Sequence, residues 1–315
     1  MNKHLAVALI SLLASMVPAM HHASNRGNGG CCTVICQVND HRFVVAYRRD
    51  ATTPAVIHIR EIQFAGRKAL QEYKNNSGGW FCHTIITKDG WVMTIGGRDN
   101  PTINRELTDL ASKIVESGKI TKDDLKKAES LIRSNGWGHF VIKSPDSTVG
   151  VAVWDYRVGS GRVNMFKLQP GWYVKVTNNP GYYAHSKWTS ISKDPVKAAV
   201  YIIGADTYGI HRRDVIVYDV NVSGGSAKID VSAAFDGGAM VGGAPGSPDP
   251  IDFMGKWIPA KSLPTIPKLK YLGTVDLTKP KPAPEHAGSS EHYSSEWPVL
   301  LPLAMVALLT LRRRA

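Results

Sequence analysis

The sequence predicts an α+β domain in which antiparallel strands come before and after one block of helices. Three observations support this fold class. β-branched and aromatic runs joined by turn residues fill the first part of the chain, two helical patterns follow in the middle, and strand patterns resume directly afterwards. A βαβ array would alternate strands and helices along the whole chain, so we expect a layered α+β domain instead.

The strands expected before the helices form hairpins. They span residues 33–37, 42–47, 56–64, 80–87 and 91–95. The first two flank the turn Val38-Asn39-Asp40-His41, and the last two flank Lys88-Asp89-Gly90, whose Asp-Gly pair is a strong hairpin signal. The region 56–64 alternates apolar and polar residues, which predicts a strand with one exposed face.

Two helices are expected next, at residues 104–116 and from Thr121 to about Ser134. The first carries its apolar residues on one face, and the second starts with an N-cap threonine followed by Asp123 and Asp124. A third helix is expected at residues 194–203, where Pro195 suits the first turn. The later strands are expected at residues 138–143, 149–154, 163–168, 171–176, 215–222 and 228–231, with a surface loop at 237–250.

The N-terminus has the pattern of a secretory signal peptide. A short basic start precedes an apolar core at residues 5–17, so we expect a signal peptide at residues 1–24 and a short propeptide at residues 25–30. A lipoprotein signal ending at Cys31 is the alternative, but Asn28 stands where such a signal has an apolar residue.

The C-terminus has a spacer followed by an apolar tail. Residues 279–297 are rich in Pro, Ser, Glu and His and predict an extended linker. Residues 298–315 are mostly apolar and end in Arg312-Arg313-Arg314, which predicts a membrane anchor or a sorting tail that is removed after export. Both ends predict an extracellular, surface-tethered body at residues 31–278.

The charge of the chain suggests an anionic partner. The leader and the tail each carry +2 of the formal net charge of +12, which leaves +8 on residues 31–278. A mild, dispersed excess of positive charge suits binding to an anionic cell envelope or an anionic substrate. Because no recognition motif accompanies this charge, it does not predict nucleic-acid binding. The histidines show no metal-ligand spacing, so no metal is expected.

The segment Gly29-Gly30-Cys31-Cys32 suggests a processing site. If the chain is cleaved between Gly30 and Cys31, the new α-amine can take the thiol proton of Cys31. The ordinary pKa of an α-amine lies near 8, so a large share of it is neutral at physiological pH. A glycine before the cysteine lets the scissile peptide bend toward the thiol.

The stretch Gly30-Cys31-Cys32-Thr33-Val34-Ile35-Cys36-Gln37 resembles the mature N-terminus of isopenicillin N acyltransferase-like Ntn hydrolases, which are related to the choloylglycine hydrolases. The resemblance implies that Cys31 is the nucleophile and that Asp50 orients its amine. An arginine normally stands three residues before that aspartate, but here Tyr47 does so. It is therefore open whether Arg48 or Arg49 enters the site.

A second match lies at Thr177-Asn178-Asn179-Pro180, which is similar to the family's Thr-Asn-x-Pro segment. It implies that Asn178 donates to the oxyanion. Ser190-Ile191-Ser192-Lys193 is similar to a Ser-x-Ser-Arg segment, with Lys193 in the place of an active-site arginine.

The resemblance further implies a four-layer αββα sandwich of two antiparallel sheets. The expected activity is hydrolysis or transfer of the acyl group of a small or short-peptide amide through a thioester, without a cofactor. The alternative is a non-catalytic surface module, in which Cys31 and Cys32 form disulfides with Cys36 or Cys82.

Overall fold

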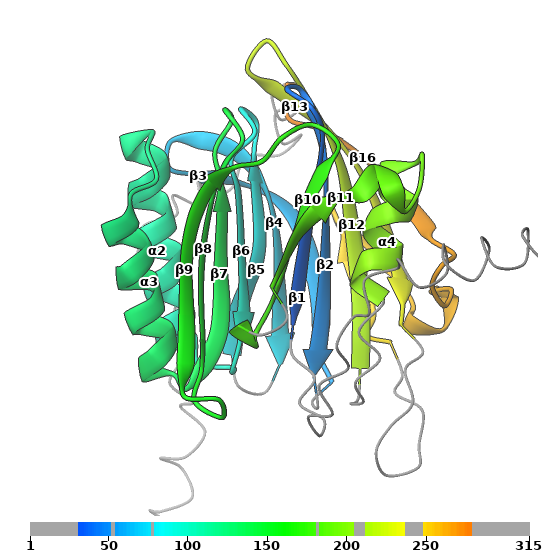
Figure 1. Ribbon diagram of the computed structural model, residues 1–315. Coiled ribbons are helices and arrows are strands. Elements are labelled where there is room, and N and C mark those ends of the chain that lie inside the picture. The colour runs from blue at the N-terminus through cyan, green and yellow to red at the C-terminus, as the bar shows by residue number, and fades with distance from the viewer. Residues whose placement is uncertain are drawn as a thin grey trace, which may run out of the picture.

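The computed structural model describes residues 31–51, 54–76, 79–180, 183–204, 212–236 and 248–278 (Figure 1). The expected signal peptide, propeptide, linker and C-terminal tail, and most of the expected loop at 237–250, lie outside these ranges. The described chain is a mixed α/β fold with two large sheets and few helices. Among the described residues, no helix combines the length and apolar character needed to cross a membrane.

One sheet has seven strands, and every neighbouring pair in it is antiparallel. In spatial order the strands are β11 (Ala184–Lys187), β10 (Trp172–Thr177), β1 (Cys32–Asn39), β2 (Arg42–Ala51), β12 (Arg212–Ser223), β13 (Ser226–Phe235) and β16 (Lys270–Asp276). The strand that begins after Cys31 therefore lies inside this sheet, between β10 and β2.

The other sheet has nine strands. In spatial order they are β15 (Lys256–Ile258), β14 (Ile251–Phe253), β3 (Val56–Phe64), β4 (Arg67–Asn76), β5 (Gly79–Thr87), β6 (Val92–Gly97), β7 (Trp137–Lys143), β8 (Thr148–Asp155) and β9 (Ser160–Lys167). β14 runs parallel to β3, so this sheet is mixed and the expectation of two purely antiparallel sheets is wrong at this pair. The long connection from β3 to β14 permits the parallel arrangement.

The helices are α2 (Pro101–Ser117), α3 (Lys122–Ser134) and α4 (Pro195–Gly204), and they confirm the three helices expected from the sequence. The Asn100 side chain caps α2, which begins three residues earlier than expected. Thr121 and Asp124 form a reciprocal capping box at the start of α3. α2 and α3 pack on strands of the nine-stranded sheet, and α4 packs on β1 and β2 (Figure 1).

Apolar side chains form three cores. The largest takes residues from both sheets, including Ile35 and Val45 of the seven-stranded sheet and Ile57 and Val141 of the nine-stranded sheet. A second core joins α2 and α3 to the nine-stranded sheet, and a third joins α4 to the seven-stranded sheet. The two faces of β1 therefore point into different cores, so the parity of a residue number decides which core a β1 side chain enters.

Candidate active site

Cys31 immediately precedes β1 and is 3% exposed. Thr33 and Ile35 of β1 face the other sheet, whereas Val34 and Cys36 face α4. Cys31 continues the first series, because its Cβ lies against Gly96 of β6 in the nine-stranded sheet. Cys32 belongs to the α4 side. The two adjacent cysteines are thus on opposite faces of the strand.

Gly96 of β6 makes room for Cys31. A Cβ atom built on Gly96 would lie 2.7 Å from Cys31 Cβ and 2.3 Å from His139 Cε1. Real Cβ atoms do not approach other atoms this closely. Cys31 and His139 therefore meet in the small volume that a side chain at position 96 would fill.

His139 of β7 connects Thr33 to Asn178. Its Nε2 lies 3.0 Å from Thr33 Oγ1, and its Nδ1 lies 2.6 Å from Asn178 Oδ1. Burial lowers the pKa of His139 to about 4, although its hydrogen bond with Asn178 raises it. The imidazole is therefore neutral at physiological pH.

Asn178 follows the last residue of β10 and is 1% exposed. Its amide oxygen forms a hydrogen bond with His139 Nδ1, and its Nδ2 has no hydrogen-bond partner among the described residues. A buried amide donor without a partner costs free energy, so its presence beside a thiol suggests a bond that is completed only when a substrate is bound.

The hydroxyl of Tyr47 contacts both Ile95 and His83. It donates to the carbonyl oxygen of Ile95 over 2.9 Å and lies 2.5 Å from His83 Nδ1. Burial raises the pKa of Tyr47 well above its ordinary value, and burial lowers the pKa of His83 well below its own. Both side chains are therefore neutral, and His83 Nε2 has no partner among the described residues.

Arg48 and Asp50 do not join this group. The Arg48 guanidinium donates to Asp50 and to the carbonyl oxygen of Ile203 in α4. Both side chains therefore lie on the α4 side of β2, across the sheet from Tyr47. Asp50 therefore lies on the opposite face of the sheet from Cys31, whose amine it was expected to orient.

Arg49 faces the space between the sheets but is engaged elsewhere. It lies 2.7 Å from Asp214 and forms an ion pair with Asp249, and all three side chains are buried. Lys193 is exposed in the turn before α4, on the side of the sheet opposite to Cys31. Gly30, the other half of the expected cleavage site, lies outside the described residues.

A further buried acid lies between the sheets. Glu72 of β4 accepts hydrogen bonds from Tyr218 over 2.6 Å and from Thr84 over 3.1 Å. Burial raises the pKa of Glu72 to about 7, against the lowering effect of these hydrogen bonds.

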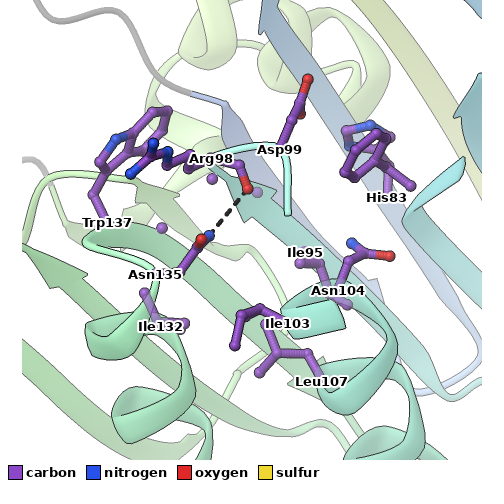
Figure 2. A pocket seen from close by; sticks show the side chains of 14 residues that line it. His83, Ile95, Arg98, Asp99, Ile103, Asn104, Leu107, Ile132, Asn135 and Trp137 are labelled. Atoms are coloured by element: carbon purple, nitrogen blue, oxygen red, sulfur yellow. Dashed lines mark hydrogen bonds between the residues drawn. The ribbon is translucent and has the colours of Figure 1, made fainter. Parts of the chain in front are cut away.

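A small hollow opens beside the site, lined in part by His83, Gly96, Asn104 and Trp137 (Figure 2). Its cavity volume is about 20 Å³, which is enough for about one water molecule. Asn135 donates to the carbonyl oxygen of Arg98 across one edge of the hollow, as Figure 2 shows.

All four cysteines of the sequence lie among the described residues, and all four are buried free thiols. Cys32 and Cys36 share the α4 face but are four residues apart along β1. At about 3.4 Å per residue their separation exceeds the reach of a disulfide. In the part of the chain that is described, no cluster of His, Cys, Asp or Glu could hold a metal ion.

Sequence reasoning missed Tyr47, His83, Gly96 and His139. The histidines show no metal-ligand spacing, and Tyr47 entered only as a departure from a motif. The one local signal was the pair Gly96-Gly97, which follows a predicted strand. Glycine at such a position often marks a place where another segment packs closely against the backbone. No protein-family model matches the sequence, and no curated protein matches it.

Proposed function

We propose that this protein is an N-terminal-cysteine amidohydrolase or acyltransferase of the Ntn-hydrolase kind, matured by cleavage between Gly30 and Cys31. The observation that carries the proposal is the buried amide donor of Asn178, which has no hydrogen-bond partner in the part of the chain that the structure describes. His139, which holds this amide, meets Cys31 above Gly96. A nucleophile and an oxyanion donor that converge from distant parts of a chain are the two groups that acyl transfer needs.

In the proposed mechanism, the α-amine of the processed Cys31 takes the proton of the thiol. The thiolate attacks the carbonyl carbon of an amide, and Asn178 Nδ2 donates to the oxygen as it becomes negative. When the C–N bond breaks, the leaving amine takes the proton from the α-ammonium group, and a thioester remains on Cys31. Water then hydrolyses the thioester, or a second amine accepts the acyl group.

His139 supports this mechanism as a neutral positioning residue. Because Asn178 Oδ1 accepts from His139 Nδ1, the amide presents its nitrogen, not its oxygen, as the free group. The low pKa of His139 keeps a positive charge out of this buried contact.

The proposal includes a four-layer αββα architecture. Its support is the core between the two sheets and the packing of α2 and α3 on one sheet and α4 on the other. Export of the chain, tethering through residues 298–315, and a small or short-peptide amide as the substrate are part of the same proposal.

The test is the mature N-terminus of the full-length protein, measured by mass spectrometry together with hydrolysis of N-acyl amino acids of graded chain length. Cys31→Ala should abolish cleavage and activity. Cys32→Ala is the matched control, because that side chain faces α4, and it should be processed normally. A Cys31→Ala protein that is still cleaved before residue 31, or a wild type that begins elsewhere, would contradict the proposal.

The alternative of a non-catalytic, disulfide-bonded surface module has less support. Cys31, Cys36 and Cys82 lie in three different environments, and the described residues contain no disulfide.

A further inference from the structure

The last strands of the two sheets lie at the same edge of the fold. β15 ends the nine-stranded sheet, and β16 ends the seven-stranded sheet. Phe253 of β14 packs against Gly273 of β16, where an added Cβ would lie 2.8 Å from the Phe253 ring. We call residues 254–271, which run from the β14–β15 turn to the start of β16, the basic rim (orange in Figure 1).

The basic rim carries positive charge that is not used inside the fold. It contains no Asp or Glu, and its lysines are Lys256, Lys261, Lys268 and Lys270. None of the four forms an ion pair with a residue that the structure describes. The adjacent acid, Asp252, already pairs with His58 and Arg60. The four ammonium groups are therefore available to an anionic partner.

Large apolar side chains are exposed beside these lysines. Trp257 is 57% exposed, Tyr271 is 59% exposed, and Met254 is 43% exposed. Met254 occupies the tip of the β14–β15 turn with a positive φ of 53°, which is uncommon for a residue with a side chain. Trp, Tyr and Lys are the residues that favour the interface between a membrane and water.

We propose that the basic rim is a membrane-binding surface, in which the four lysines attract anionic lipid headgroups and Trp257 and Met254 enter the headgroup layer. Lysines near an anionic bilayer are attracted to it within about a Debye length. A soluble polyanion would pair with the lysines but leave Trp257 and Met254 in water, so a lipid surface accounts for both sets of side chains.

The proposed tether would keep the basic rim close to a membrane. Thr278, the last residue that the structure describes, follows β16 directly, and the linker expected at residues 279–297 can span at most about 65 Å. A contact held within this distance needs little affinity of its own. This retention at the membrane rests on the proposed function, whereas the affinity of the basic rim for anionic lipid does not.

A bilayer on the basic rim would not cover the candidate active site. Gly96 lies on β6, five strands from β15 in the order of the sheet. At about 4.8 Å per strand this separation is about 24 Å. A substrate can therefore approach Cys31 while the basic rim lies on lipid.

The experiment measures oxidation of the full-length protein by hydroxyl radicals, with the modified peptides quantified by mass spectrometry. The protein is reconstituted in vesicles of phosphatidylcholine, or of three parts phosphatidylcholine to one part phosphatidylglycerol. On the anionic vesicles Trp257 and Met254 should be oxidised about threefold more slowly or less, and high salt should remove the difference. Tyr156, which is 61% exposed and follows β8, is the internal reference and should react equally on both.

Charge variants provide the matched control. Replacing the four rim lysines by Gln should abolish the protection of Trp257. The control replaces four exposed lysines of the α2–α3 region by Gln, namely Lys113, Lys119, Lys122 and Lys127, and it should keep the protection although it loses the same charge. Trp257→Ser changes a single exposed residue, and it should reduce the protection measured at Met254.

Three results would overturn the inference. The first is equal oxidation of Trp257 on the two kinds of vesicle. The second is protection that is already complete on neutral vesicles, because protein and not lipid would then cover the basic rim. The third is equal protection by soluble polyphosphate without lipid, which would identify a site for a polyanion.

Extraction with alkaline carbonate tests the proposed tether separately. A chain that carbonate extracts, but that sediments with anionic vesicles and not with neutral ones, retains this inference and rejects the tether. A chain that resists extraction, and whose Trp257 stays fully reactive on anionic vesicles, rejects this inference alone.

Discussion

His139 Nδ1 lies 2.6 Å from Asn178 Oδ1, and this contact determines which atom of the Asn178 amide is left to act. The imidazole takes the oxygen, so the nitrogen is the free donor. Asn178 comes from the end of β10 in one sheet and His139 from β7 in the other, so the site depends on how the sheets pack.

Replacing Asn178 by Asp tests its role as an oxyanion donor. The variant keeps an oxygen for His139 but has no donor, so kcat of the processed enzyme should fall by about 10²–10³-fold. Asn178→Ala should lose as much activity and also about 1–3 kcal/mol of stability, because His139 is left without its partner. Asn221→Asp, at an exposed position of β12, is the control. Activity of Asn178→Asp within tenfold of the wild type would exclude the proposed role.

Gly96→Ala should disrupt the meeting of Cys31 and His139. The new Cβ would overlap both side chains, so they must shift, at a cost of about 1–3 kcal/mol. We expect slower alkylation of Cys31 as well as a lower midpoint in urea. Gly224→Ala is the comparison, because it strains a turn with φ of 57° but adds no clash. It should lower stability without changing the reactivity of Cys31, and equal effects of both variants on alkylation would contradict the assigned role of Gly96.

Local signals predicted most of the helices and hairpins. Thr121 and Asp124 form the cap that their spacing predicts, and the hairpin at Asp89-Gly90 joins β5 to β6. β4 was not predicted, because its sequence contains charged residues that indicate a solvated segment. The fold buries two of these, Glu72 and Lys74, between the sheets. β11, β14, β15 and β16 were also missed, since three of them have only three or four residues and β14 and β16 pair with strands far away in the sequence.

Only the site residues that belong to a short sequence motif could be predicted. Cys31 and Asn178 were expected from short motifs, and both lie near His139. The expected roles of Arg48 and Asp50 depended on which face of β2 they occupy, and one residue of register decides this. His139 could not be found from its neighbours in sequence, because its partner Thr33 is 106 positions away.

Glu72 should make the protein less stable as the pH rises. Its pKa is raised to about 7 in the folded state from an ordinary value of 4.5, so the folded state binds the proton more tightly than the unfolded state does. The free energy of unfolding should therefore fall between about pH 4.5 and pH 7, by up to about 3 kcal/mol from this group. In Glu72→Gln that part of the slope should vanish in urea titrations. Glu106→Gln, an exposed change on α2, should keep the wild-type slope, and an unaltered slope in Glu72→Gln would rule out this source.

Lys143 should have the opposite dependence. Its ammonium group is buried 4.0 Å from the centre of the Phe43 ring, and burial lowers its pKa from 10.5 to about 7. The unfolded state then binds the proton more tightly, so the contribution to the free energy of unfolding rises with pH between about 7 and 10.5. Lys143→Met removes the cost of burying the charge and should stabilise the protein by about 1–3 kcal/mol at pH 6 but by less at pH 9.5. Urea unfolding at the two pH values measures this difference. Lys167→Met, at an exposed position of β9, should change stability little at either pH. A Lys143→Met protein that is less stable than the wild type at pH 6 would mean that the cation contributes more through Phe43 and the Ser144 carbonyl than its desolvation costs.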